Sequence, residues 1–508
     1  MMKTDFSFNL ALLISGILFA GCSTPLPTSL VPQTASSAPD YFCTWNIQGY
    51  IASYPDTSGS MREQMTEENI FGDGPYQNWV EFFPEIRSDL YFVMDDSWDI
   101  PREMNARWGN PYFGTMELSE DRFPSFKGNP ATRLKALVDS VKAKGWKGLG
   151  GWVSAQEAED STGVAPEDYW IRRLDAARDA GFAYWKVDWG ANERNPEWRK
   201  MLTRLGKEHA PDLCIEHAMG TDFIQFSDAY RTYDVENIIA QSYTIQRVAD
   251  LLPYSAQGDA KGIINCEDEP YIAVGLGCAI GVMRHPFAGS LPDGRQDFAF
   301  PPVGHNYKEC LDELTRAVRW HRIAGPFGVD GDYNVDPLIL TDSWEYRERE
   351  SWRGDRKPGD IISGSAPATV SRHMALPTVE DTTSTRPFVL ASTYPNGAVA
   401  VSAIGRALGR EYVTKEVPVT IEGKDWHAPV GIFGKFESLT IRYPDAPERK
   451  KLRVYAQDLA GEVPVDITRD VTIKGNCMIV SGETINKVGL MNATEGDLSG
   501  PGLVIKVM

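Results

Sequence analysis

The sequence is poor in side chains that bind transition metals. Its seven histidines are dispersed, with no H-x-H or H-E-x-x-H pattern. After Cys22, six scattered cysteines form no C-x-x-C pair: Cys43, Cys214, Cys266, Cys278, Cys310 and Cys477. We therefore expect neither a transition-metal site nor a cofactor. The thiols are expected to be small buried side chains, although the sequence leaves a disulfide open.

The chain also has little positive charge for its size. Its 508 residues include 51 Lys and Arg against 70 Asp and Glu, a formal net charge of −19. This balance argues against nucleic acid or an anionic membrane surface as the partner. Fourteen Trp and twenty Tyr are unusually many. They favour a protein that offers aromatic surface to a neutral ligand.

The N-terminal apolar run, Leu10 to Ala20, is too short for a comfortable transmembrane span. With Lys3 before it and small residues after it, the run is typical of a secretory signal. Leu18-Phe19-Ala20-Gly21-Cys22 resembles the lipobox of bacterial lipoproteins, which implies lipidation of Cys22 and anchoring to a bacterial membrane, in the periplasm or at the cell surface. The alternative is a plain signal peptide with an incidental cysteine. We assign residues 1–21 to the signal peptide and residues 22–39, rich in Ser, Thr and Pro, to a flexible tether.

Residues 40–345 alternate short apolar segments with amphipathic helices. Helices are predicted to begin at Asn129-Pro130, Pro166 and Asn195-Pro196, with Gly145 and Gly181 ending the first two. The predicted strands are Phe42–Trp45, Leu90–Met94, Lys147–Val153, Phe182–Val187, Leu213–Ile215, Tyr230–Tyr233, Gly262–Asn265 and Met283–Phe287, before a last helix from about Lys308 to Ile323. Such units predict a (β/α)8 TIM barrel. The alternative, a doubly wound sheet, lacks a G-x-G-x-x-G motif after the first strand.

The pattern of polar and apolar residues changes after the predicted barrel. We interpret residues 346–385 as a polar, irregular connector. Residues 386–508 contain alternating β-type segments separated by turn signals such as Pro395-Asn396-Gly397. This pattern predicts a C-terminal antiparallel β-sandwich.

Polar and aromatic side chains gather where the predicted barrel strands end, which is where a TIM barrel places its active site. In chain order these are Trp45 and Asn46; Asp95, Asp96 and Trp98; Trp152; Lys186 and Asp188; Glu216 and His217; Arg231 and Asp234. Trp45, Trp98, Trp152 and Glu216 are expected to contact the substrate. Lys186 and Asp188 are two residues apart on a strand, so they share a face, and the lysine is expected to keep the aspartate ionised. We interpret His217 as structural and Glu267 to Glu269 as the acidic first turn of a helix.

The order of these motifs carries a family resemblance. Thr44-Trp45-Asn46, Val93-Met94-Asp95-Asp96-Ser97-Trp98, Lys186-Val187-Asp188 and Arg231-Thr232-Tyr233-Asp234 follow one another along the chain. This order resembles the clan D glycoside hydrolases, most closely families 27 and 36, the α-galactosidases and their relatives. The resemblance spans about Tyr41 to Leu340.

The resemblance implies a role for each motif. Asp188 would be the nucleophile and Lys186 a contact to sugar hydroxyls. Asp95 and Asp96 would hold the 4- and 6-hydroxyls. Arg231 would contact the 2-hydroxyl, and Asp234 would be the acid/base. Family 27 usually has three residues between that arginine and the acid and this chain has two, so Glu236 and Asp228 are alternatives for the acid/base role.

The sequence therefore predicts an exo-acting, retaining α-glycosidase that releases terminal α-galactosyl residues from an oligosaccharide or polysaccharide. A β-L-arabinopyranosidase is a close alternative, because its substrate has the same ring configuration without the hydroxymethyl group. An alternative of another class is a surface glycan-binding lipoprotein without turnover.

Overall fold

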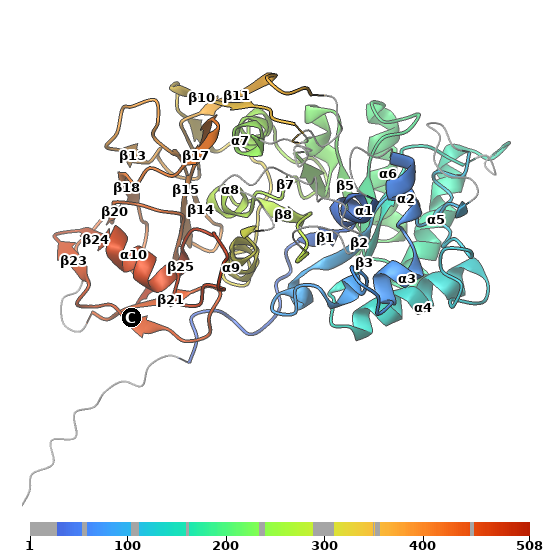
Figure 1. Ribbon diagram of the computed structural model, residues 1–508, viewed down its shortest axis with the longest axis horizontal. Coiled ribbons are helices and arrows are strands. Elements are labelled where there is room, and N and C mark those ends of the chain that lie inside the picture. The colour runs from blue at the N-terminus through green and yellow to red at the C-terminus, as the bar shows by residue number, and fades with distance from the viewer. Residues whose placement is uncertain are drawn as a thin grey trace, which may run out of the picture.

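The computed structural model describes residues 28–52, 58–102, 111–158, 162–232, 239–287, 309–348, 350, 356–447 and 452–508. The predicted signal peptide, Cys22, Asp234 and Glu236 lie outside these residues. Within them, no helix is both long enough and apolar enough to span a membrane. The chain forms a barrel followed by a β-rich domain, which lie side by side in Figure 1.

Eight parallel strands form a closed barrel in the order of the sequence. The strands are β1 (Tyr41–Cys43), β2 (Tyr91–Met94), β3 (Gly148–Val153), β4 (Tyr184–Val187), β5 (Cys214–His217), β6 (Ala229–Arg231), β7 (Ile263–Glu267) and β8 (Ala279–Val282). The barrel closes where Tyr41 pairs with Gly281 and Phe42 with Val282. The predicted TIM barrel is confirmed.

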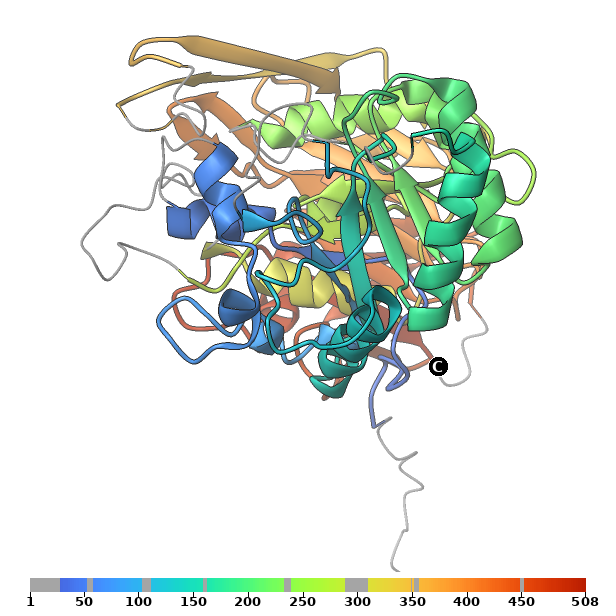
Figure 2. The ribbon, with the colours of Figure 1, turned by 90° about the vertical axis from the view of Figure 1, so that its right-hand side faces the viewer.

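Helices connect the strands and surround the barrel (Figure 2). They are α1 (Trp45–Ala52), α2 (Ser58–Glu63), α3 (Glu67–Phe71), α4 (Pro130–Ala143), α5 (Pro166–Ala180), α6 (Pro196–His209), α7 (Ala240–Leu251), α8 (Pro270–Gly275) and α9 (Asp312–Trp320). The three predicted helix starts are confirmed: the side chains of Asn129 and Asn195 accept N–H groups of the first turns of α4 and α6. Gly181 ends α5 at a φ of 75°, where a side chain would be strained.

The predicted position of the eighth strand is wrong. The strand is Ala279–Val282, and residues 283–287 follow it. The short helix α8, Gly277 at a φ of 63° and β8 lie in one continuous apolar stretch. Periodicity cannot divide such a stretch into helix, turn and strand.

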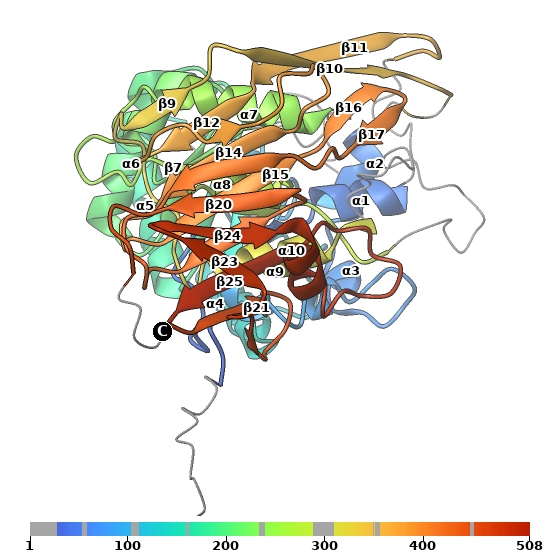
Figure 3. The ribbon, with the colours of Figure 1, turned by 90° about the vertical axis from the view of Figure 1, so that its left-hand side faces the viewer.

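The second domain contains two large facing sheets, seen from its outer side in Figure 3. The eight-stranded sheet has the order β22 (Val465–Asp466), β21 (Val454–Asp458), β25 (Gly502–Val507), β19 (Val430–Phe433), β15 (Val399–Ile404), β14 (Phe388–Thr393), β12 (Thr369–Arg372) and β9 (Tyr333–Val335). The five-stranded sheet has the order β13 (Thr378–Val379), β18 (Pro418–Glu422), β20 (Ser438–Arg442), β24 (Cys477–Ser481) and β23 (Val471–Lys474).

Apolar side chains of both sheets form one core, exemplified by Val401 and Ile432 from the larger sheet and Ile441 and Val480 from the smaller. Helix α10 (Gly482–Gly489) contributes Ile485 to the same core. A further four-stranded sheet has the order β11 (Ile361–Pro367), β10 (Ile339–Glu345), β16 (Arg406–Gly409) and β17 (Glu411–Val413). The predicted sandwich is thus present.

Three details of the sandwich differ from the prediction. Some pairs are parallel, such as β15 with β19 and β18 with β20, so the sheets are mixed. Residues 346–385, predicted as a connector, contain β11, β12 and β13, and exposed residues alternate with buried ones along β11. Strand β9 already pairs with β12, so the barrel ends before residue 345.

The predicted flexible tether is wrong for its described part, residues 28–39. The N–H of Leu30 donates to Gln457 of the second domain at 2.6 Å, and the N–H of Ser36 donates to Asp89 of the barrel at 2.6 Å. Val31 and Ala38 are buried. This segment therefore packs along both domains.

The two domains contact each other through α8 and α9. The hydroxyl of Tyr394 donates to the carbonyl of Val274 at 2.6 Å. A Cβ on Gly275 would lie 2.2 Å from the hydroxyl of Ser402, so glycine permits this close approach of α8 to β15. Arg316 of α9 and Asp458 of the sandwich form a fully buried ion pair, with Nε and Oδ1 2.9 Å apart.

We predict that Asp458→Ala lowers the free energy of unfolding by about 3–5 kcal/mol, because it leaves the Arg316 guanidinium buried without its counter-ion. Urea denaturation measures this change. The matched control is Glu422→Ala, whose pair with Arg442 is about half exposed and contributes at most about 1 kcal/mol. Equal losses in the two variants would contradict the prediction.

Candidate active site

Ionisable side chains meet at the carboxyl ends of the barrel strands, as the sequence predicts. The strands β1, β2, β4, β5, β6 and β7 contribute, in that order, Cys43, Asp95 with Asp96, Lys186 with Asp188, Glu216, Arg231 and Glu267.

Asp188 lies directly after β4, with its side chain 10% exposed. The indole N–H of Trp152 donates to its Oδ2 at 2.9 Å, and Nη2 of Arg231 lies 2.7 Å from its Oδ1. Arg199 holds the backbone of the same residue, because its Nη2 donates to the Asp188 carbonyl at 2.7 Å. The carboxylate is thus fixed in orientation and paired with a cation, and its side chain is slightly exposed.

Arg231 is fully buried and lies among three carboxylates. Besides Asp188, it pairs with Glu216 at 3.0 Å and with Glu267 at 3.8 Å. Burial alone would lower the pKa of Arg231, but the three carboxylates raise it well above its ordinary value. Burial raises the pKa of Glu216 although Arg231 opposes the shift, and Tyr184 donates its hydroxyl to Glu216 at 2.8 Å.

Arg231 and Glu216 were predicted to contact substrate. The structure places both side chains beneath the surface, where they support Asp188. Both are enclosed because the inner residues of β5 and β6 face the packed interior of the barrel.

Lys186 and Asp188 share a face of the site, as strand alternation predicts. However, Lys186 pairs with Asp95, with Nζ and Oδ2 2.8 Å apart, and Arg231 takes the place expected for the lysine beside Asp188. The thiol of Cys43 also donates to Asp95 at 2.8 Å. Burial would raise the pKa of Asp95, but Lys186 and Cys43 lower it below its ordinary value.

Asp96 points to a different partner from Asp95. Nε of Arg62 lies 2.7 Å from its Oδ2, and the hydroxyl of Ser97 donates to its Oδ1 at 2.8 Å. Ser97 adopts a φ of 88°, a strained conformation of the kind that gathers at functional sites. Burial raises the pKa of Asp96 to about 6, although Arg62 opposes the shift.

An aromatic wall lies between Asp188 and Arg62. Trp152, Trp189 and Phe113 pack with ring centroids 4.9–5.4 Å apart. The guanidinium of Arg62 lies over the rings of Phe113 and Trp189 at 5.3 and 5.5 Å. Trp189 is partly exposed, as is Trp45 at the start of α1, so both offer apolar ring surface beside the carboxylates.

Trp98 was predicted to bind substrate, and this is wrong. Its side chain is fully buried, packs against Phe182 and donates its indole N–H to the carbonyl of Trp152 at 2.8 Å. Trp152 is itself buried, and its own N–H is directed at Asp188.

His217 is structural, as predicted. Its two ring nitrogens lie 3.1 Å from Arg199 and 2.8 Å from Thr203. Burial, with Arg199 and Arg231 nearby, lowers the pKa of His217 well below its ordinary value. The imidazole is therefore neutral and enclosed.

The interpretation of Glu267 as part of a helix is wrong, because it is the last residue of β7 and contacts Arg231. The acidic run before Pro270 resembled a helix start. Sequence analysis also missed Arg62, whose segment shows no periodic pattern. Trp189 could be predicted from the sequence, because it directly follows Asp188.

Of the acid/base candidates, the structure describes only Asp228. It precedes β6, at the opposite end of the strand from the site, where it pairs with Lys207 and accepts the N–H of Ile215 at 3.2 Å. Asp228 is therefore structural, and Asp234 and Glu236 remain the candidates. Among the described residues, no cluster of three or more His, Cys, Asp or Glu side chains is suited to a metal ion.

No protein-family model matches the chain, and no curated protein matches it. Several solved structures are similar. A candidate α-galactosidase from Bacteroides fragilis is 11% identical, with 92% of this chain and 79% of that chain covered and a TM-score of 0.44. α-Galactosidase I from Mortierella vinacea is 11% identical, with 93% and 96% covered and a TM-score of 0.39. A glycoside hydrolase family 27 β-L-arabinopyranosidase from Geobacillus stearothermophilus is 10% identical, with 92% and 96% covered and a TM-score of 0.39.

Asp99, next to the site, gives a prediction on pH. Burial raises the pKa of Asp99 to about 7, although the backbone N–H of Met116, which donates to its carboxylate, opposes the shift. A carboxyl whose folded pKa exceeds its unfolded value of about 4 binds its proton more tightly when folded, so ionising it costs stability. As pH rises from about 4 to about 7, the wild type should lose at least about 1 kcal/mol more stability than Asp99→Asn.

Urea denaturation of both proteins across this pH range measures the difference. The control is Asp139→Asn, on an exposed face of α4, which should follow the wild-type profile. Parallel profiles for the wild type and Asp99→Asn would contradict the raised pKa.

Proposed function

We propose that the protein is a retaining α-glycosidase of the clan D type, in which Asp188 is the nucleophile. The observation that carries this proposal is the state of Asp188. It is a carboxylate at a barrel strand end, with its side chain 10% exposed, oriented by the Trp152 N–H at 2.9 Å and paired with Arg231 at 2.7 Å. A nucleophile needs that fixed geometry and that charge.

The mechanism is double displacement. Asp188 attacks the anomeric carbon, forming a glycosyl-enzyme bond as the bond to the leaving oxygen breaks. A second carboxyl group, about 5–5.5 Å away, donates the proton to that oxygen and then removes one from the attacking water. Asp234 is the proposed acid/base because it follows Arg231 and the end of β6.

The surroundings of Asp188 suit a sugar ring. Trp45 and Trp189 offer ring surface on which C–H groups can pack. Lys186 and Asp96, both nearly buried, are the proposed donor and acceptor for hydroxyls. A terminal α-galactosyl residue is the proposed substrate. β-L-Arabinopyranoside, which has no 6-hydroxyl, is a second candidate. Arg62 and Ser97 already engage both oxygens of Asp96, so Asp96 would bind the 6-hydroxyl of galactose less strongly.

We predict that Asp188→Asn lowers turnover of an aryl α-galactoside at least about a thousandfold, because the amide keeps the shape but cannot act as nucleophile. Release of the aryl group measures turnover, and thermal melting checks the fold. The control is Asp179→Asn, on the exposed face of α5. A wild type that binds the glycoside without releasing the aryl group would support the non-catalytic glycan-binding alternative. An aryl β-L-arabinopyranoside in the same assay decides between the two sugars.

The acid/base role gives a further prediction. Asp234→Ala should slow substrates with poor leaving groups by about 10²–10⁴-fold and activated aryl glycosides far less, because only the former need a proton on departure. Azide should restore turnover of the activated substrate, giving a glycosyl azide of retained configuration. Glu236→Ala is the matched comparison. If the leaving-group pattern appears there and Asp234→Ala slows both substrates equally, Glu236 is the acid/base.

A further inference from the structure

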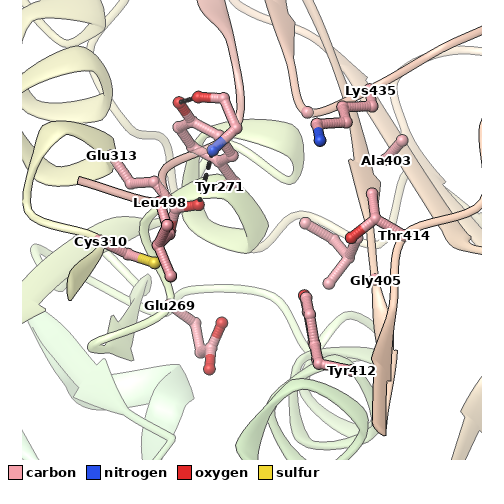
Figure 4. Close-up of a pocket in the computed structure, with 13 residues that line it drawn as sticks. Glu269, Tyr271, Cys310, Glu313, Ala403, Gly405, Tyr412, Thr414, Lys435 and Leu498 are labelled. Atoms are coloured by element: carbon pink, nitrogen blue, oxygen red, sulfur yellow. Dashed lines mark hydrogen bonds between the residues drawn. The ribbon is translucent and has the colours of Figure 1, made fainter. Parts of the chain in front are cut away.

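A cavity of about 160 Å³ lies between the barrel and the sandwich, separate from the strand-end carboxylates (Figure 4). Glu269 and Glu313 line it from the barrel, and Tyr412, Thr414 and Lys435 line it from the sandwich. Because one water occupies about 30 Å³, the space corresponds to about five waters. That is room for one small ring with its hydroxyl groups.

The two walls carry complementary polar groups. Glu269, at the start of α8, is 5% exposed and directs its carboxylate toward the space, and Lys435, after β19, extends its Nζ into it from the other side (Figure 4). Glu313 contacts the Gly500 N–H at 3.4 Å and Arg284 at 3.5 Å. Both contacts are long, so its carboxylate keeps capacity to accept a stronger hydrogen bond.

The cavity also has apolar surface and hydroxyl groups. Leu498, 56% exposed, and the ring of Tyr412 face it from different sides (Figure 4). Burial, followed by the charges of Glu269 and Glu313, raises the pKa of Tyr412 well above its ordinary value. Its hydroxyl therefore stays protonated at neutral pH, and the hydroxyl of Thr414 can donate or accept a hydrogen bond.

The charges exclude most classes of small ligand. Two nearly buried carboxylates disfavour an anion, and the ammonium of Lys435 disfavours a metal cation. Donors on one wall, acceptors on the other and apolar surface between them suit an uncharged polyhydroxyl ring. We propose that this cavity is a second carbohydrate site, which binds one neutral pyranose unit between the two domains.

The second site lies next to the proposed active site along the chain. The turn between β7 and α8 supplies Glu267 to the charge network beneath Asp188 and Glu269 to the cavity, two residues later. A pyranose unit bound in the cavity would therefore contact the same turn that supplies Glu267 to the proposed active site. The inference rests on the proposed function only in taking carbohydrate as the ligand.

The test is isothermal titration of the intact protein with D-galactose, L-arabinose, D-glucose and D-mannose, followed by a crystal structure with each sugar that binds. At least one sugar should occupy the cavity, with hydroxyls on Nζ of Lys435 and on Glu269. Lys435→Met should weaken binding there at least about tenfold, through loss of a charge-assisted hydrogen bond. The control is Lys474→Met, at the exposed end of β23, which should leave the affinity unchanged.

Thr414→Val serves as a second variant if melting shows that Lys435→Met does not fold. The proposal is overturned if none of the four sugars occupies the cavity, if a sugar appears only in crystals without heat of binding in solution, or if the folded cavity variants bind as the wild type does. Sugar bound at the candidate active site is identified separately in the same crystals. Loss of turnover or binding there bears on the proposed function alone.

Discussion

The ion pairs of Arg231 are the interaction on which the architecture of the site depends. A guanidinium without solvent exposure costs several kcal/mol in lost hydration. That cost is offset because Asp188, Glu216 and Glu267 approach it from three different strands. The stabilisation is mutual: Arg231 neutralises the charge of Asp188, and the three carboxylates offset the cost of burying Arg231. Removing any one member leaves uncompensated charge inside the barrel.

Strand register explains how side chains distant in sequence reach Arg231. In parallel pairing, Lys186 lies beside Glu216, and Arg231 lies beside Asn265. Glu267 is two residues beyond Asn265 and so shares its face. The inward-facing residues of β4 to β7 therefore lie in one layer at the carboxyl end of the barrel. Closure of the barrel brings the ends of these neighbouring strands together, so that their charged side chains meet.

The barrel and the gathering of ionisable side chains at its strand ends, Asp188 among them, followed from the sequence, because helix caps at Asn129 and Asn195 and the order of strand ends are local signals. The partners of Asp188 did not follow. Lys186 is nearer in sequence, yet Arg231 is nearer in space, and only the closed barrel decides between them. The sequence also did not predict that Arg62 pairs with Asp96 or that Glu267 ends a barrel strand. Arg62 lies in α2, a helix of six residues that is too short to show a periodic pattern. An acidic run before a proline is compatible with either a strand end or a helix start.

The second domain contributes to the site through the turn after β7. Helix α8 begins at Pro270, and the sandwich packs closely on its far end, where Gly275 meets Ser402. Between strand and helix, Asp268 adopts a φ of 59° and accepts the backbone N–H groups of Met283 and Arg284 after β8. The sandwich thus fixes α8, and α8 with Asp268 fixes the end of β7 that carries Glu267. The position of a carboxylate beside Arg231 therefore depends on packing between domains, and the barrel needs the sandwich to hold its charge network in place.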